Sequence, residues 1–156
     1  MTALGIDIGG SSVKAASMDS GGHWEVASSV PYAMADRAEI QKAIRACIED
    51  LEATEPESVG LCLPGRMNPE GTAIELSVNL PVLNGWEFDE LLGSVFDAFP
   101  ARVHIASDAL AAGFDYATHA AISGRTAAIS LGTGVGLCVL DGDDPVTIGH
   151  KGIGHL

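Results

Sequence analysis

The segment TALGIDIGGSSVKAASM, residues 2–18, sets the fold class of this chain. Two apolar runs of strand length, residues 2–8 and 12–18, are joined by a Gly-Gly turn, and this pattern predicts a β-hairpin. Such a bare turn exposes several backbone N–H groups, which can hold an anion such as phosphate closely. A second glycine-rich segment, LGTGVG at residues 131–136, also follows one apolar run and precedes another. Two such segments, both with hydroxyl side chains, predict a cleft that grips a polyphosphate from two sides.

The composition indicates a folded protein that binds neither nucleic acid nor membrane. The 156 residues are 47% hydrophobic and include 19 glycines, which suits a buried core with many turns, and the length favours one domain. The net charge of -13 disfavours a nucleic-acid partner. No apolar run approaches the roughly 20 residues that cross a bilayer, and no signal-peptide pattern is present, so we expect a cytoplasmic protein. The three cysteines, Cys47, Cys62 and Cys138, show no metal-type spacing and are expected to be reduced and buried.

Hydrophobic periodicity divides the rest of the chain into strands and helices. Apolar residues at helical spacing predict helices over residues 35–53, 88–99 and 108–121, and Asp36 with Glu39 is a start signal for the first. Short apolar runs predict strands at residues 24–30, 58–63, 102–106, 126–131 and 135–140. One more short strand is expected near residues 72–75, within an irregular loop that spans residues 66–86. This order of elements fits an α/β layer architecture.

Asp7 ends the first predicted strand, at the edge where open α/β sheets place their ligands. We interpret it as a carboxylate associated with Mg²⁺ beside bound phosphate, because magnesium uses few protein carboxylates and keeps several waters. The alternative is a turn residue that hydrogen-bonds its own backbone. Lys14 either adds a cation or faces solvent, since strand alternation allows both. The neighbours that would admit the phosphate or donate hydroxyls to it are Gly9, Gly10, Ser11 and Ser12.

Asp108 lies where a predicted strand meets a predicted helix. An aspartate at a helix start is ordinarily a cap. At the ligand edge of a sheet, however, a carboxylate can also accept the proton of an attacking hydroxyl. Phosphoryl transfer needs little more than such a base, positioning and charge neutralisation, so we assign Asp108 as a general base. His155, taken alone, is more typical of a structural histidine.

Together these segments resemble the ROK family of sugar kinases, in the actin-like and hexokinase ATPase superfamily. GIDIGGS at residues 5–11 resembles the first phosphate motif of that family, and residues 131–136 resemble the second. LCLPG at residues 61–65 is similar to a family strand that ends in Pro-Gly. The remaining similar segments are Asn79-Leu80-Pro81 with Gly85-Trp86 (a sugar-side loop with a short insertion), Ser107-Asp108-Ala109 (the catalytic-base motif) and Gly154-His155 (the end of a Glu-Ile-Gly-His motif).

The resemblance implies a ribonuclease H-like lobe of the actin and hexokinase type over residues 1–122, an α/β lobe whose mixed five-stranded sheet is flanked by helices. Residues 123–156 would begin an incomplete second lobe. The implied reaction moves a phosphoryl group from ATP, with Mg²⁺, to a hexose hydroxyl, and Asp108 is the catalytic base.

The resemblance also assigns binding residues. The first glycine segment, with Asp7 and Lys14, would hold the nucleotide together with a second set, Gly132, Thr133, Gly134 and Gly136. The sugar side would comprise Pro64, Gly65, Asn79, Leu80, Ser107 and His155.

Departures from the family pattern leave alternatives open. Ser107 replaces a sugar-binding Asn and Gly152 a sugar-binding Glu, so the identity of the sugar stays open. The chain has about half the usual family length and contains no zinc motif. An unfinished second lobe leaves apolar surface and strand edges to cover, so we expect a homodimer or pairing with a missing second lobe.

Two other activities also remain open. The Gly-Gly-Ser turn with Lys14 is also similar to polyphosphate-dependent glucokinases, which makes polyphosphate an alternative donor. A non-catalytic sugar sensor is a further alternative. Family repressors carry DNA-binding helices before the first phosphate motif, and a strand that starts at residue 2 leaves no room for them. The retained Asp108 favours catalysis.

Overall fold

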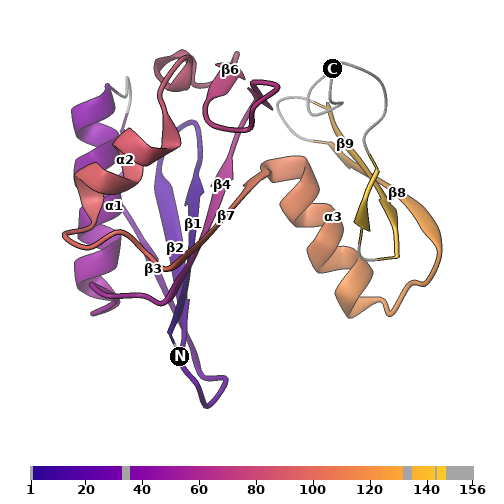
Figure 1. The fold of residues 1–156 in the computed structure, drawn as a ribbon, viewed down its shortest axis with the longest axis horizontal. Coiled ribbons are helices and arrows are strands. Elements are labelled where there is room, and N and C mark those ends of the chain that lie inside the picture. The colour runs from indigo at the N-terminus through magenta and orange to yellow at the C-terminus, as the bar shows by residue number, and fades with distance from the viewer. Residues whose placement is uncertain (1, 33–35, 132–134, 143, 147–156) are drawn as a thin grey trace.

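The computed structural model describes residues 2–32, 36–131, 135–142 and 144–146, and it contains the mixed five-stranded sheet expected from the sequence (Figure 1). The strand order is β3-β2-β1-β4-β7. The parallel strands are β1 (Ala3–Ile8), β4 (Ser58–Leu63) and β7 (Arg102–Ser107), and the antiparallel strands are β2 (Val13–Met18) and β3 (Trp24–Ser28). The carboxyl ends of β1, β4 and β7 therefore meet at one edge, uppermost in Figure 1.

Strand β3 ends at Ser28, although the sequence predicts a strand up to residue 30. The regular ladder ends at Ser29, because its hydroxyl oxygen accepts the hydrogen bond that a backbone carbonyl of β3 would otherwise accept. The Val13 N–H donates to Ser29 Oγ at 2.9 Å, and the Ser29 N–H donates to the Val13 carbonyl at 2.8 Å. The chain then turns away from β2 toward the end of β1.

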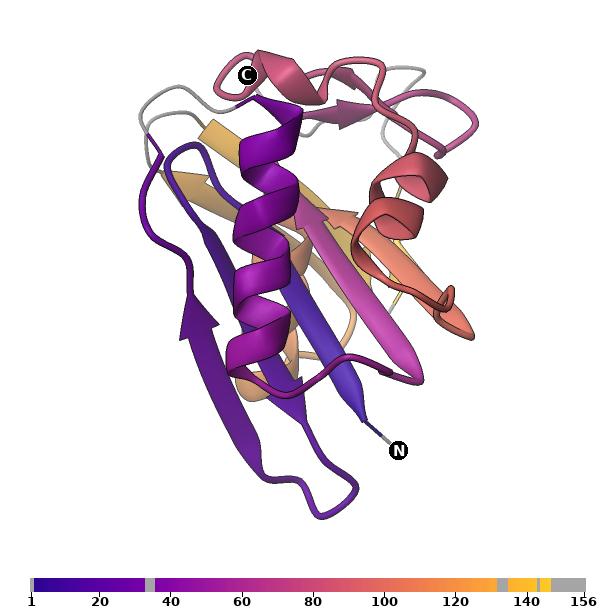
Figure 2. The same ribbon diagram turned by 90° about the vertical axis from the view of Figure 1, so that its left-hand side faces the viewer.

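One face of the sheet is covered by helices α1 (Arg37–Asp50) and α2 (Phe88–Val95), which lie in front of it in Figure 2. The predicted start signal of α1 is confirmed, because the Asp36 carboxylate accepts the Glu39 N–H at 2.8 Å. Burial of each large apolar side chain contributes about 1.5–3 kcal/mol. The main buried helix residues are Ile40, Ile44, Cys47 and Ile48 from α1, and Phe88, Leu91, Leu92 and Val95 from α2.

Helix α2 is shorter than the predicted span of residues 88–99. Phe96 leaves the helix with φ -113° and ψ 136°, and this extended conformation lets its ring stay buried in the core. Pro100 also disfavours helical backbone at the residue before it. The periodicity therefore predicts the helix correctly but not its end.

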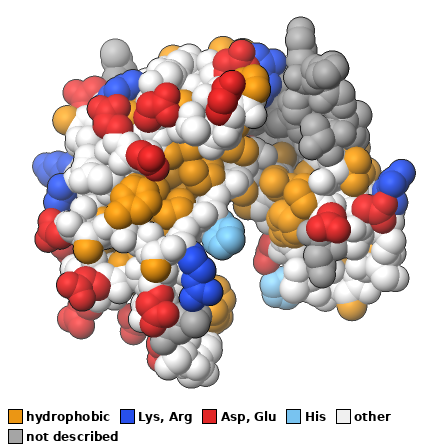
Figure 3. All heavy atoms as spheres, viewed as in Figure 1, with side chains coloured by type: hydrophobic (Ala, Val, Ile, Leu, Met, Phe, Trp, Pro, Cys, Tyr) orange, Lys and Arg blue, Asp and Glu red, His pale blue; other side chains and the backbone are white. Residues whose placement is uncertain are grey.

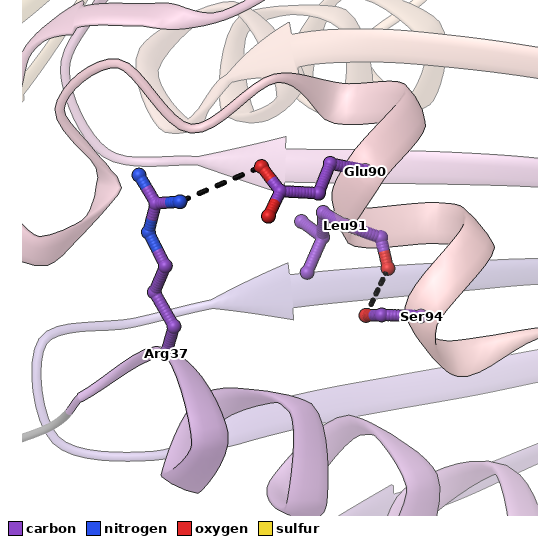
Figure 4. Close-up of polar contacts among 4 residues, drawn as sticks. All are labelled: Arg37, Glu90, Leu91 and Ser94. Atoms are coloured by element: carbon purple, nitrogen blue, oxygen red, sulfur yellow. Dashed lines mark hydrogen bonds and ion pairs between the residues drawn. The ribbon is translucent and has the colours of Figure 1, made fainter.

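Arg37, the first residue of α1, links this helix to Glu90 of α2 (Figure 4). Its Nη1 lies 3.5 Å from Glu90 Oε2, and its guanidinium lies 4.9 Å from the centroid of the buried Trp86 ring. The ion pair is exposed and is worth about 1 kcal/mol or less. Within α2, the Ser94 hydroxyl donates to the Leu91 carbonyl at 2.6 Å. The cation over the indole therefore adds to the packing that fixes Trp86 at the start of α2.

A short hairpin, β5 (Arg66–Met67) with β6 (Ile74–Leu76), and the 3-10 helix η1 (Pro81–Leu83) lie between β4 and α2 in the chain. The sequence predicts a strand near β6 but not its partner β5. Two residues are too few for a period-two pattern, and the pairing depends on a partner seven residues away.

Beyond β7 the chain forms α3 (Asp108–His119) and a three-stranded sheet of β8 (Arg125–Leu131), β9 (Val135–Asp141) and β10 (Asp144–Pro145). Helix α3 packs closely on this sheet, because a Cβ at Gly113 would overlap Cys138 Sγ. No helix in the described ranges is both long enough and apolar enough to span a bilayer.

Candidate active site

The carboxyl edge of the sheet places two predicted site carboxylates around one thiol, that of Cys62. Asp7 on β1 is in register with Cys62 on β4, and Cys62 is in register with Ala106, two residues before Asp108. Burial raises the pKa of the Cys62 thiol to about 12, with further contributions from the charge of Asp7, the charge of Asp108 and a hydrogen bond to Asp7. Both carboxylates are therefore close enough to act on the same side chain.

A hollow of about 620 Å³ lies on the sheet face opposite α1 and α2. Asp7, Lys14, Cys62 and Ala106 line it from the sheet, and Ala111 lines it from α3. In Figure 3 a notch is visible between the sheet and the α3 part of the molecule, with apolar side chains on its walls. Lys14 is exposed and pairs in register with Asp7. It is therefore placed to add a cation beside this carboxylate.

The Gly9–Ser12 turn, meaning residues 9–12 between β1 and β2, is closed by one internal hydrogen bond. The Gly9 N–H donates to the Ser12 carbonyl at 3.0 Å. The N–H groups of Gly10 and Ser11 are exposed and donate to no acceptor among the described residues. A Cβ built on Gly10 would lie 3.7 Å from the Asn79 carbonyl oxygen, so the predicted phosphate turn and the predicted sugar loop are neighbours.

The predicted sugar loop is held by a buried serine. Ser77 is 1% exposed, its Oγ accepts the Leu80 N–H at 3.2 Å, and its N–H donates to Asn84 Oδ1 at 2.6 Å. Asn79 is exposed, whereas Leu80 is buried in the core, so any contact of Leu80 with a ligand would come from its backbone.

Pro64 and Gly65 are both buried and follow β4 directly. Gly65 has φ +122°, and a Cβ there would lie 2.5 Å from the Leu76 carbonyl oxygen. The Pro-Gly turn therefore packs against the residues that lead into the sugar loop.

The cap of α3 is Ser107, and Asp108 is the first residue of the helix. The Ser107 hydroxyl oxygen caps the helix by accepting the Leu110 N–H at 3.2 Å, and Asp108 Oδ1 accepts the Ala109 N–H at 2.8 Å. The described residues offer Asp108 Oδ2 no hydrogen-bond partner. One carboxylate oxygen of Asp108 is thus held by the start of the helix.

The second glycine segment lies against the same helix turn where it is described. A Cβ on Gly136 would approach Ala109 Cβ to 2.9 Å and would overlap Ser130 Oγ. The other predicted residues of this segment, and the predicted histidine, lie outside the described residues: Gly132, Thr133, Gly134 and His155.

Two residues at this edge were not predicted as site residues. Cys62 is half-buried, although the sequence predicts a buried cysteine. Side chains alternate between the two faces of β4, and Cys62 lies on the face that lines the hollow. Tyr32 contacts the Gly9–Ser12 turn from a distant part of the chain, and no local sequence signal marks it.

The described residues at this edge of the sheet offer few side-chain ligands for a magnesium ion. The described ranges contain no group of three His, Cys, Asp or Glu side chains that could hold a metal. Magnesium commonly binds through one or two carboxylates, with water and phosphate oxygens filling its other positions. Asp7 beside the predicted anion-binding turn fits that mode of binding.

We expect the folded chain to lose stability as the pH rises from 9 to 12. In the folded state the pKa of Cys62 is raised from 9.0 to about 12, and burial with the nearby Asp7 raises that of Tyr32 from 10.0 to about 12. The folded chain therefore keeps two protons that the unfolded chain releases, so the free energy of unfolding falls across this window. Urea midpoints at pH 8, 10 and 11 measure the slope. The double variant Cys62→Ala/Tyr32→Phe should flatten it, and equal slopes for the two proteins would contradict the assignment.

Comparison with known proteins relates the chain to one family. The family model described as "ROK family" matches residues 3–156. No curated protein sequence matches the chain significantly. A ROK family protein from Streptococcus pneumoniae in complex with sucrose is 24% identical with a TM-score of 0.77, over 99% of this chain and 50% of that one. A putative N-acetylmannosamine kinase from Listeria monocytogenes is 20% identical with a TM-score of 0.78, over 99% of this chain and 52% of that one.

A ROK glucokinase from Streptomyces griseus, solved with glucose and AMPPNP, is 24% identical with a TM-score of 0.72, over 98% of this chain and 48% of that one. Other structures with this fold include a polyphosphate/ATP glucomannokinase from Arthrobacter and a ROK transcriptional regulator. The chain therefore has the ROK fold and spans about half the length of these three sugar-kinase and ROK structures.

Proposed function

This chain belongs to the ROK family, and we propose that it acts as a sugar kinase in which Asp108 is the general base. The observation that carries the proposal is the carboxyl edge of the sheet. There Asp7 and Asp108 flank Cys62, and the Gly9–Ser12 turn adjoins the loop that contains Asn79.

The chemistry assigned to Asp108 is one proton transfer. A hexose hydroxyl attacks the terminal phosphorus of the donor, the new O–P bond forms, and the bond from that phosphorus to the bridging oxygen of ADP breaks. The hydroxyl proton passes to Asp108 Oδ2, while the Ala109 N–H holds Oδ1 in place. Asn79 and the backbone around Pro64 and Gly65 would orient the sugar, and His155 would contact it.

The phosphoryl donor is assigned to the two glycine segments. The exposed N–H groups of Gly10 and Ser11 would bind phosphate oxygens, and Lys14 would add a positive charge. Mg²⁺ would neutralise phosphate charge and would be held through water by Asp7. We propose ATP as the donor because the Streptomyces glucokinase was solved with an ATP analogue, and polyphosphate is the second candidate because the Arthrobacter enzyme is named for both.

In this proposal residues 1–122 form the sugar-binding lobe, and residues 123–156 begin the lobe that completes the nucleotide site. The matched structures are about twice as long as this chain. The complete site would therefore include residues that pair with this chain, either from a second lobe or from a second copy.

The test is sugar-dependent release of ADP, measured by a coupled assay across a panel of hexoses and N-acetylhexosamines with ATP and Mg²⁺. At least one sugar should raise the rate above the sugar-free control. A parallel series with inorganic polyphosphate, followed by sugar phosphate formation, decides between the two donors.

A sugar sensor is the competing function, because one matched structure is a transcriptional regulator. It would bind a sugar in calorimetry with no turnover from either donor. That result would overturn the kinase proposal.

A further inference from the structure

Tyr32 is bound to the Gly9–Ser12 turn by two hydrogen bonds, although it lies at least 20 residues away along the chain. Its hydroxyl donates to the Gly9 carbonyl at 2.5 Å, and its N–H donates to the Ser11 carbonyl at 2.8 Å. The side chain is 8% exposed and belongs to the hydrophobic core. The ring is therefore anchored in the core while its polar end holds the turn.

Three of the four carbonyl groups of the turn, those of Gly9, Ser11 and Ser12, accept hydrogen bonds. The Gly9 and Ser11 carbonyls accept from Tyr32, and the Ser12 carbonyl accepts the Gly9 N–H. The N–H groups of Gly10 and Ser11 remain exposed, with no acceptor among the described residues. Because carbonyl oxygens repel phosphate and N–H groups attract it, holding these three carbonyls leaves the N–H groups of Gly10 and Ser11 to meet an anion.

The position of Tyr32 also depends on the preceding residues. Ser29 is bonded to Val13 in both directions, through its hydroxyl oxygen and through its N–H. The segment from Ser29 to Tyr32 is thus fixed alongside both ends of the turn. A glycine pair would otherwise sample many conformations, and ordering it on binding would cost affinity.

We propose that Tyr32 is a positioning residue, which holds the Gly9–Ser12 turn in its anion-receiving conformation and so sets the affinity of the chain for the phosphoryl donor. The inference rests on the proposed function, because it assigns the turn to the donor phosphates. The inference adds to that function a residue, Tyr32, that preorganises the Gly9–Ser12 turn.

The test compares Tyr32→Phe with Tyr116→Phe, since Tyr116 is the only other tyrosine of the chain and is exposed on α3. The first readout is amide hydrogen exchange of the 156-residue protein. Loss of one hydrogen bond changes an equilibrium by about fivefold to tenfold. We therefore expect Gly9 N–H exchange to speed up by about that factor in Tyr32→Phe and to stay unchanged in Tyr116→Phe. Unchanged exchange at Ile6 and Leu61 would show that the core remains folded.

The second readout is binding of inorganic tripolyphosphate, followed by the amide chemical shifts of Gly10 and Ser11. The wild type should show saturable shifts, and Tyr32→Phe should need about fivefold to tenfold more ligand. Equal Gly9 exchange in the wild type and Tyr32→Phe would overturn the positioning role. Equal tripolyphosphate affinity, or no binding by the wild type, would overturn the link to the donor.

These readouts do not require turnover. A chain that binds tripolyphosphate in a Tyr32-dependent way but releases no ADP with any sugar would overturn the kinase proposal and support this inference.

Discussion

Replacement of Asp108 by asparagine is expected to lower sugar-dependent ADP release by about 10²- to 10⁴-fold, the range typical for loss of a general base. The amide can still accept the Ala109 N–H through its oxygen, so the start of α3 should remain intact. The amide cannot accept the hydroxyl proton of the sugar, and the chemical step is therefore lost. Steady-state kinetics of the coupled assay give kcat and the KM for the sugar, and we expect the loss in kcat.

Asp115→Asn is the matched control, because Asp115 lies two turns further along the same helix and its side chain is 75% exposed. It loses the same charge, away from the carboxyl edge of the sheet, and should keep wild-type turnover. Thermal melting of both variants checks the fold, since removal of a negative charge at a helix N-terminus costs about 0.3–1 kcal/mol. Turnover by Asp108→Asn equal to that of the wild type would remove Asp108 from the role of base.

Gly65→Ala should destabilise the protein by about 2–4 kcal/mol, the sum of backbone strain and overpacking. Gly65 has φ +122°, a conformation that residues with a Cβ rarely adopt. The new methyl group would also lie 2.5 Å from the Leu76 carbonyl oxygen and 3.0 Å from Ser77 Cα. These contacts are backbone atoms and cannot rotate away. Urea unfolding of the variant and the wild type measures the difference.

Gly71→Ala separates strain from crowding. Gly71 has φ +72°, and nothing lies within 4 Å of a Cβ built there. Only the left-handed conformation is penalised at this site, by about 1–2 kcal/mol. If the two variants lost equal stability, the close packing of Gly65 on the sugar loop would not contribute.

The sequence predicts most of the sheet and its helices, because their signals repeat over several residues. The apolar stripe that begins at Ile40 and the cap formed by Asp36 with Glu39 predict α1 within a few residues of its bounds. The ends of elements are predicted less well. Ser29 leaves its strand through a side-chain hydrogen bond, and Phe96 leaves its helix to keep its ring buried, and neither change interrupts the apolar pattern.

The same distinction applies to the candidate site: local signals predict some of its residues, and pairing between distant segments decides the others. Asp7 and Asp108 can be assigned from sequence because each lies at the carboxyl end of a strand, and parallel strands end at the same edge. Cys62 could have been added by alternation, but its contact with Asp7 depends on pairing between residues 55 positions apart. The hydroxyl of Tyr32 and the carbonyl of Gly9 meet across 23 residues, with no periodic pattern between them.

Local sequence patterns are enough to indicate the order of the main helices and strands, the glycine turns and the carboxylates at strand ends, because these depend on the conformational preferences of neighbouring residues. The tertiary structure is needed to show that Cys62 lies on the strand between Asp7 and Asp108, that Tyr32 binds the Gly9–Ser12 turn, and that this turn adjoins the loop that contains Asn79. Those contacts join distant segments, and they form because sheet register and core packing fix the segments relative to one another.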